Sequence, residues 1–323
     1  MRVLVTGGAG FIGSHLVEHF YKNTDWEIII LDRLNYAGSL DRLVQFRSDA
    51  RVTFRFHDIR GQISQQLLRR LEGVHVIVHA AAETHVENSL HEPLVFVESN
   101  VGGTFQMLEA ARALQVDKFV MVSTDEVFGP APMGVDYKED DRLDPSNPYS
   151  ATKAGAEALV LAWAKCFKLP VLLTRTMNNF GERQHPEKFV PMVMRKVLNS
   201  EQVNIHFQYQ GNTKVIGSRK WLHARNHSDG ILHLLKTKQS GKFHIAGEEL
   251  TNLQMADRVA SIIGKPMNYE LVDWHSSRPG HDLRYSMDDS KIRATGWKPP
   301  LKLQDSLEKT VKWTLEHKEW LDG

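Results

Sequence analysis

The chain has 323 residues, of which 41% are hydrophobic and 24% charged, a composition typical of globular proteins. Its 40 Lys and Arg residues balance 39 Asp and Glu, so the charge predicts no binding to nucleic acid or to an anionic membrane. A single cysteine, Cys166, excludes an internal disulfide and favours a reducing, cytoplasmic compartment. We expect neither a signal peptide nor a membrane span, because no charged leader precedes Arg2 and no apolar run reaches about 20 residues.

The N-terminal stretch has the pattern of a dinucleotide-binding site. A strand, Arg2 to Thr6, leads into a glycine-rich turn and an amphipathic helix, and a second strand, Glu27 to Leu31, ends at Asp32. Glycines at such a turn let the backbone approach a pyrophosphate, which rests on the helix N-terminus, while the acidic residue accepts from ribose hydroxyls. The turn residues expected to contact the cofactor are Gly7, Gly10, Phe11, Ile12 and Gly13.

Asp32 favours NAD over NADP, because its carboxylate would repel the extra 2′-phosphate. Arg33 points the other way, since an arginine at this place could accommodate that phosphate. The alternative interpretation is that Arg33 is a solvated surface residue.

Strand and helix patterns continue in alternation. Strands are predicted at Arg51 to Phe56, Val74 to His79 and Lys118 to Val122, and a helix at Val101 to Leu114. Alternation of this kind predicts an α/β fold with a doubly wound parallel sheet. Two sets of residues follow strands: Asp58, which could cap a turn or bind the adenine amine, and Ala80, Ala81 and Ala82, whose small size suggests close approach to the cofactor.

Two adjacent carboxylates, Asp125 and Glu126, follow the predicted strand Lys118 to Val122. Buried carboxylates are costly to keep for packing alone. Ligands of open α/β sheets also bind at the carboxyl ends of the strands. We therefore interpret Asp125 and Glu126 as an acid/base pair.

Tyr149 and Lys153 open a helix predicted to run to about Lys168. Their i, i+4 spacing places both on one helical face. A cation beside a phenol lowers the phenol's pKa toward neutrality, which would make Tyr149 a general base for an alcohol that loses hydride. The alternative is a tyrosine packed near an exposed lysine.

The chain resembles the extended short-chain dehydrogenases/reductases, and among them the dTDP-glucose 4,6-dehydratases. The triplet Thr124-Asp125-Glu126 discriminates best, because epimerases and decarboxylases of the superfamily typically carry another residue where Asp125 stands. The stretches that carry the resemblance are Thr6–Gly13, Tyr36–Gly38, Ala81–Val86, Ser123–Gly129, Tyr149–Lys153, Asn178–Gly181, Pro186–Lys188 and Arg278–Asp282.

The resemblance implies NAD-dependent dehydration of a nucleoside-diphosphate hexose, most simply dTDP-glucose, in a cycle that regenerates NAD. Tyr149, helped by Lys153 and Thr124, would take the 4-hydroxyl proton while the C4 hydride goes to NAD. Glu126 would then abstract the C5 proton, Asp125 would protonate the departing 6-hydroxyl, and the hydride would return to C6. No metal is implied.

The resemblance also implies a Rossmann-like NAD-binding domain at 1–176, joined by 222–247, and a smaller, interwoven nucleotide-sugar domain at 177–323. Further cofactor contacts would be Asn35, Ile59, Thr84, Ser99 and Asn179. Substrate contacts would be Thr84, Thr124, Asn178, Glu187, Lys188, Phe189, His206, Arg219, Asn252, Arg278 and His281. Taken singly, Asn252 could instead cap the helix Leu253 to Ile263, and Arg278 could be an ordinary loop charge.

The departures from the family pattern concern the nucleotide. The family usually has Pro-Ile-Tyr-Gly where this chain has Asn204-Ile-His206-Phe, the stretch Gln208 to Gly217 is longer than usual, and Lys220 replaces a customary Asp. Base identity therefore stays open, with UDP-glucose or another nucleotide-hexose as the alternative substrate. A 4-epimerase, a decarboxylase and a non-catalytic nucleotide-binding scaffold are the remaining alternatives, and none of them needs both Asp125 and Glu126.

The family is usually dimeric. Pairing the helix Val101 to Leu114 and the Tyr149 helix against their symmetry mates would make a homodimer. The candidate seam residues are Met107, Leu108, Ala111, Leu159 and Ala162. The alternative is that these residues face the sheet.

Overall fold

A seven-stranded parallel sheet forms the centre of the molecule. The computed structural model describes residues 1–273 and 283–322, and within them the strand order of this sheet is β11-β6-β5-β4-β1-β2-β3. The strands are β1 (Arg2–Thr6), β2 (Glu27–Asp32), β3 (Val52–Phe56), β4 (Val76–His79), β5 (Lys118–Thr124), β6 (Val171–Thr176) and β11 (Gly241–Ile245). The predicted α/β class with a doubly wound parallel sheet is confirmed.

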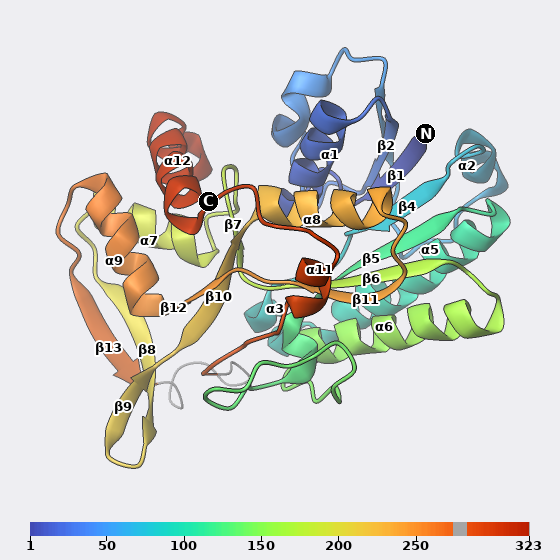
Figure 1. The fold of residues 1–323 in the computed structure, drawn as a ribbon. Helices are drawn as coiled ribbons and strands as arrows, with labels where there is room; N and C mark the ends of the chain where they lie inside the picture. The colour runs from blue at the N-terminus through green and yellow to red at the C-terminus, as the bar shows by residue number, and fades with distance from the viewer. Residues whose placement is uncertain (274–282, 323) are drawn as a thin grey trace.

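The sequence of β1 shows why both faces of this sheet are covered. Side chains alternate across a strand, so Val3 and Val5 enter one apolar cluster while Leu4 enters another. Helices α1 (Phe11–Asn23) and α8 (Ala224–Lys236) pack on the first face. Helices α5 (Gly103–Ala113) and α6 (Pro148–Cys166) pack on the second, as Figure 1 shows. Strands apolar on both faces form buried parallel sheets.

A buried ion pair fixes α6 to the sheet. Arg175 on β6 donates from Nε to Glu157 Oε1 at 2.9 Å and from Nη2 to Glu157 Oε2 at 2.7 Å. Both residues are almost fully buried, where a paired charge is far more stable than a single one. The pair thus holds the helix that carries Tyr149 and Lys153 in a fixed place.

The C-terminal half adds a second, smaller α/β region beside the sheet (Figure 1). Its apolar cluster joins α7 (Phe189–Leu198), α9 (Asn252–Ile263) and α12 (Leu303–Glu316). Two three-stranded sheets accompany them, ordered β12-β10-β7 and β13-β8-β9. Their strands are β7 (Asn179–Phe180), β8 (Val203–Gln210), β9 (Thr213–Ile216), β10 (Ser218–His223), β12 (Glu248–Thr251) and β13 (Tyr269–Asp273).

Shorter elements complete the described chain. They are α2 (Gln65–Arg70), α3 (Val86–His91), α4 (Pro93–Phe96), α11 (Ser290–Ala294), the 3-10 helices η1 (Leu40–Phe46), η3 (Asp125–Phe128) and η4 (Lys318–Trp320), and the π-helix η2 (Val97–Gly102). Among the helices described, none is long and apolar enough to cross a membrane.

One expectation about helices is wrong, and one alternative interpretation is excluded. Met107, Leu108 and Ala111 are fully buried against the sheet, so they are no seam residues, and only Ala162 of the predicted set is exposed. Asn252 does not cap α9 either. Thr251 is the N-cap, with its side chain accepting from the Gln254 backbone at 3.1 Å.

Candidate active site

A cavity of about 330 Å³ lies at the carboxyl ends of the central strands. It brings together residues from both halves of the chain, as ligand sites of open α/β sheets do. The predicted site residues that line it are Gly7, Gly10, Phe11, Ile12, Gly13, Asp32, Arg33, Asn35, Ile59, Ala80, Ala81, Ala82, Thr84, Ser99, Thr124, Asp125, Glu126, Tyr149, Lys153, Asn178, Asn179, Glu187, Lys188 and Phe189.

Four predicted residues do not line this cavity: Asp58, His206, Arg219 and Asn252. Arg219 still acts on it, because its charge lowers the pKa of both Asp125 and Glu126. The stretch that replaces the family's base-stacking strand lies in β8, where it pairs with β9 and β13. Arg278 and His281 lie outside the described residues.

The glycine turn fits the pyrophosphate of a dinucleotide. A Cβ on Gly13 would come within 2.0 Å of the Gly7 carbonyl oxygen, and one on Gly7 within 2.7 Å of Ala81 Cα, so neither position admits a side chain. Helix α1 has a glycine N-cap without a side-chain hydrogen bond and no acidic residue in its first turn. Its first N–H groups therefore remain available to an anion.

Asp32 is held at the end of β2 by two backbone N–H groups. Oδ2 accepts from Ala9 at 2.9 Å and Oδ1 from Leu34 at 2.8 Å. This fixes the carboxylate beside the glycine turn, where it would meet an adenosine ribose.

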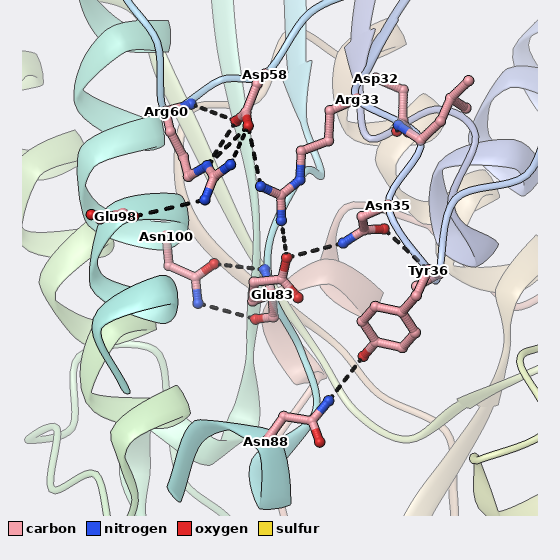
Figure 2. Close-up of polar contacts among 12 residues, drawn as sticks. Asp32, Arg33, Asn35, Tyr36, Asp58, Arg60, Glu83, Asn88, Glu98 and Asn100 are labelled. Atoms are coloured by element: carbon pink, nitrogen blue, oxygen red, sulfur yellow. Dashed lines mark hydrogen bonds and ion pairs between the residues drawn. The ribbon is translucent and has the colours of Figure 1, made fainter. Parts of the chain in front are cut away.

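Arg33 is neither a solvated arginine nor one free for a phosphate. Figure 2 shows its guanidinium between Asp58, with Nη1 at 3.2 Å from Oδ2, and Glu83, which accepts from Nη2. Asp58 also caps a turn, because its Oδ1 accepts from the Arg60 backbone N–H at 3.0 Å. Burial opposes ionisation of Asp58, but hydrogen bonds from Arg60 and Arg33 lower its pKa to about 2.

Of the two carboxylates after β5, Asp125 is buried and Glu126 is partly buried, and they have different hydrogen-bond partners. Asp125 Oδ1 accepts from the Thr124 hydroxyl at 3.0 Å, while Oδ2 has no hydrogen-bond partner among the described residues. Glu126 Oε2 accepts from Asn147 Nδ2 at 3.3 Å. Thr124 caps the short helix η3 that carries both acids, with its hydroxyl accepting from the Glu126 backbone at 3.3 Å.

Burial makes this pair titrate near neutrality. It raises the pKa of Asp125 to about 6, and burial together with the charge of Asp125 raises the pKa of Glu126 to about 7. Two neighbouring carboxylates that interact in this way titrate as a unit. The pair can therefore hold one proton and one charge at once, as an acid and a base acting in one site require.

The expected lowering of the Tyr149 pKa is wrong for the structure described. Burial and then the charge of Glu126 raise this pKa well above its usual value, while a hydrogen bond with Thr124 acts in the opposite sense. Lys153 Nζ donates to the Val122 carbonyl at 2.9 Å, and burial lowers its pKa to about 8. Burial and the charge of Glu126 therefore affect the Tyr149 pKa more strongly than the Lys153 cation that the i, i+4 spacing places nearby.

Several polar atoms on the cavity wall are buried and unpartnered within the described residues. Besides Asp125 Oδ2 they are His57 Nε2, Ser99 Oγ, Ser123 Oγ, Asn179 Oδ1 and Gln184 Oε1. Leaving such an atom unsatisfied costs about 1–3 kcal/mol. Their gathering at one cavity fits a large polar ligand that meets them.

Several residues of the site were not predicted from the sequence, among them Asn147, Glu83 and Ser123. Asn147 caps α6 in a reciprocal capping box with Ser150, a pattern visible in the sequence as Asn-Pro-Tyr-Ser before an apolar helix. Glu83 and Ser123 line the cavity, and both lie in stretches that carry the family resemblance, although neither was assigned a role. Across residues 1–273 and 283–322, no group of three or more His, Cys, Asp or Glu side chains could hold a metal.

Over residues 4–310 the chain matches the family described as GDP-mannose 4,6 dehydratase. The chain belongs to this family. It is 38% identical to the low-salt glycan biosynthesis protein Agl12 of Haloferax volcanii, over 98% of this chain and 99% of that protein. It is also 38% identical to a dTDP-glucose 4,6-dehydratase of Streptomyces niveus, over 99% of this chain and 94% of that enzyme.

Solved structures of the dehydratase family agree. DesIV, a dTDP-glucose 4,6-dehydratase of Streptomyces venezuelae determined with NAD and dTDP bound, matches with a TM-score of 0.90 at 38% identity. The match covers 100% of this chain and 99% of that one. The resemblance to the dTDP-glucose 4,6-dehydratases is confirmed.

Proposed function

We propose that this member of the dehydratase family converts dTDP-glucose to dTDP-4-keto-6-deoxyglucose, a step of deoxysugar biosynthesis, with bound NAD. The observation that carries the proposal is a pair of carboxylates, the buried Asp125 and the partly buried Glu126, in the same cavity as Tyr149 and Lys153. Epimerisation and decarboxylation use the tyrosine and lysine but have no need of both carboxylates. Relatives and structural neighbours named dTDP-glucose 4,6-dehydratase support the same activity.

NAD would be held by the glycine turn, the N-terminus of α1 and Asp32. Bound there, it would supply the oxidant for C4 and the hydride for C6. The Asp32 carboxylate disfavours a 2′-phosphate, and Arg33, engaged by Asp58 and Glu83, does not compensate for it. We therefore assign NAD rather than NADP.

Tyr149 would take the proton of the 4-hydroxyl. Next to burial, the charge of Glu126 is what most opposes its ionisation, so a proton on the Asp125–Glu126 pair makes the phenol more acidic. Thr124 hydrogen-bonds this phenol and would also bind the sugar hydroxyl. Lys153 lies one helical turn away on the same face.

The carboxylates would divide the elimination. Asn147 orients Glu126, which would take the C5 proton once a ketone at C4 has made that proton acidic. The unpartnered Oδ2 of Asp125 is free to carry the proton that goes to the 6-hydroxyl as it leaves as water. Each such proton transfer contributes about 10²–10⁴-fold.

At the other end of the cavity, Asn178, Glu187, Lys188 and Phe189 would receive the sugar diphosphate. Lys188 lines the cavity, and the charge of Arg219, which does not line it, also reaches the site; two cations of this kind suit phosphates. We also propose contacts from His206, Asn252, Arg278 and His281 to the nucleotide.

The test is to incubate the protein with dTDP-glucose and, separately, with UDP-glucose and to measure the alkaline absorbance of the 4-keto-6-deoxy product. Product from dTDP-glucose is expected. Product from UDP-glucose alone would change the assigned nucleotide base from thymine to uracil but would leave the assigned dehydration unchanged. No product from either, with folded protein that carries NAD, would contradict the dehydratase assignment.

We further propose a cytoplasmic homodimer. Phe105 on α5, Trp163 on α6 and Phe167 just after α6 form a continuous aromatic face, with ring centroids 5.9 Å and 5.4 Å apart in successive pairs. Leu94 and Val97, on the neighbouring α4 and η2, are also largely exposed. An apolar surface of this kind fits burial against a second copy. The lone cysteine, Cys166, is exposed and free, which fits a reducing compartment.

A further inference from the structure

An ion pair joins the segments that follow two strands of the central sheet. Arg33 follows β2, Glu83 follows β4, and β1, which leads into the turn, lies between these strands in the sheet. Both side chains line the cavity beside Asp32. Asn35 Nδ2 donates to the same Glu83 oxygen as Arg33, at 3.0 Å.

Glu83 is the fixed partner of this pair. Its backbone N–H donates to Asn100 Oδ1 at 2.8 Å, and its carbonyl accepts from Asn100 Nδ2 at 3.1 Å (Figure 2). Asn100 also donates to Thr152 Oγ1 at 3.0 Å, which anchors this corner to the helix α6 that carries Tyr149. The carboxylate of Glu83 is therefore a rigid acceptor, and the Glu83 side chain is 10% exposed.

Arg33 is held from the opposite side as well. Asp58 binds it and also binds Arg60, whose Nε donates to Asp58 Oδ2 at 2.9 Å. Arg60 is more exposed than Arg33 and does not line the cavity. Asp58 thus contacts Arg33 on the cavity wall and Arg60 outside it. Substitutions of these two arginines can therefore be compared.

We propose that the Arg33–Glu83 pair is a clasp that encloses the adenosine half of NAD and slows its release. This rests on the proposed function, since the clasp needs a bound dinucleotide. The chemistry gives it a purpose, because the dehydration restores NAD in every cycle and the enzyme gains nothing from cofactor exchange. An adenosine bound between the ends of β2 and β4 would contact the Arg33–Glu83 pair. The cofactor would have to pass this pair to dissociate.

The test measures cofactor exchange in the full-length holoenzyme. Protein carrying unlabelled NAD is mixed with a large excess of ring-deuterated NAD, and native mass spectrometry follows the replacement. We expect Arg33→Gln to exchange roughly tenfold faster, the factor that corresponds to losing one hydrogen bond to a charged group. Glu83→Gln should have the same effect, and the double variant no more than either, because the two side chains act as a pair.

Arg60→Gln is the matched control, since it removes the other arginine of Asp58 and should exchange like wild type. Arg33→Lys, which keeps a charge for Glu83, should recover part of the retention, and saturating NAD should restore turnover in Arg33→Gln. If Arg33→Gln does not fold, Glu83→Gln decides.

Wild-type exchange rates in both Arg33→Gln and Glu83→Gln would overturn the clasp alone. Equal acceleration in Arg60→Gln would also overturn it, because the effect would then be a general loosening of the loops. A wild-type protein that neither carries nor takes up NAD would overturn both the clasp and the proposed function.

Discussion

The chemistry of Asp125 and Glu126 depends on where the backbone places them. Burial raises the pKa values to about 6 and about 7, and the proximity of two like charges adds to the rise at Glu126. Thr124 and Asn147 each satisfy one oxygen, which leaves Asp125 Oδ2 for a ligand. The different side-chain contacts of Asp125 and Glu126, more than the order of their pKa values, distinguish the proposed acid from the proposed base.

Replacing Asp125 by Asn should separate the two chemical stages. Without its proton donor the loss of the 6-hydroxyl should slow by roughly a hundredfold or more, while substrate still reduces bound NAD. Rapid-mixing absorbance of reduced nicotinamide, run beside quenched product analysis, measures both. Glu126→Gln is the comparison and should instead slow exchange of the C5 proton. Equal loss of both stages in Asp125→Asn would show that Asp125 is not the acid.

The same carboxylates should lower the stability of the fold at neutral pH. Their folded pKa values are raised from 3.8 and 4.5, so the folded state binds protons more tightly and loses stability as the pH rises to about 6 and 7. Asp125→Asn should therefore unfold a few degrees higher than wild type near pH 8, a gain on the order of 2 kcal/mol.

The gain should vanish below about pH 3, where the wild-type carboxyl is protonated in both states. Thermal melts across this range measure it, with Asp117→Asn, at an exposed position just before β5, as the control. A lower melting temperature for Asp125→Asn at every pH would refute the argument.

At the scale of elements, continuous apolar runs predicted the strands of the fold correctly, whereas segments without such a pattern were not predicted. β1 is found at the predicted residues and β2 extends one residue further, because continuous apolar runs bounded by glycine and charge specify buried strands. The π-helix η2 (Val97–Gly102) was unpredicted, since its Ser, Asn, Val and Gly residues are weak helix formers. The partners of Arg33 lie 25 and 50 residues away in the chain, so no local pattern could reveal the Arg33–Glu83 pair.

The N-terminus of α6 links helix stability to catalysis. Asn147 Oδ1 accepts from the Ser150 N–H at 2.9 Å, while its Nδ2 binds Glu126. Asn147→Ala should cost about 1 kcal/mol of stability and also lower the turnover rate by roughly tenfold or more, because Glu126 loses its orientation.

Ser64→Ala is the control for Asn147→Ala. Ser64 caps α2 by accepting from Leu67 at 3.2 Å, and it does not line the cavity. Its loss should lower the melting temperature but leave turnover intact. If Asn147→Ala behaved in the same way, Asn147 would be a cap and nothing more.

At the scale of the whole molecule, the aromatic face Phe105, Trp163 and Phe167 should join two copies. Phe105→Glu places a charge there and should convert a dimer to a monomer, as size-exclusion chromatography with light scattering would show. Tyr209→Glu, on the hairpin β8–β9 at the opposite side of Figure 1, is the control and should remain dimeric. A monomeric wild type, or a dimeric Phe105→Glu, would contradict this assignment.

The central claim is an internal redox cycle in which the hydride taken from C4 returns to C6 of the same sugar. It is tested most directly with dTDP-glucose deuterated at C4, followed by NMR and mass spectrometry of the product. The account predicts a 4-keto-6-deoxy sugar with the deuterium in its C6 methyl group and no net reduction of NAD. Deuterium lost to solvent, retained at C4 or passed to added NAD would contradict it.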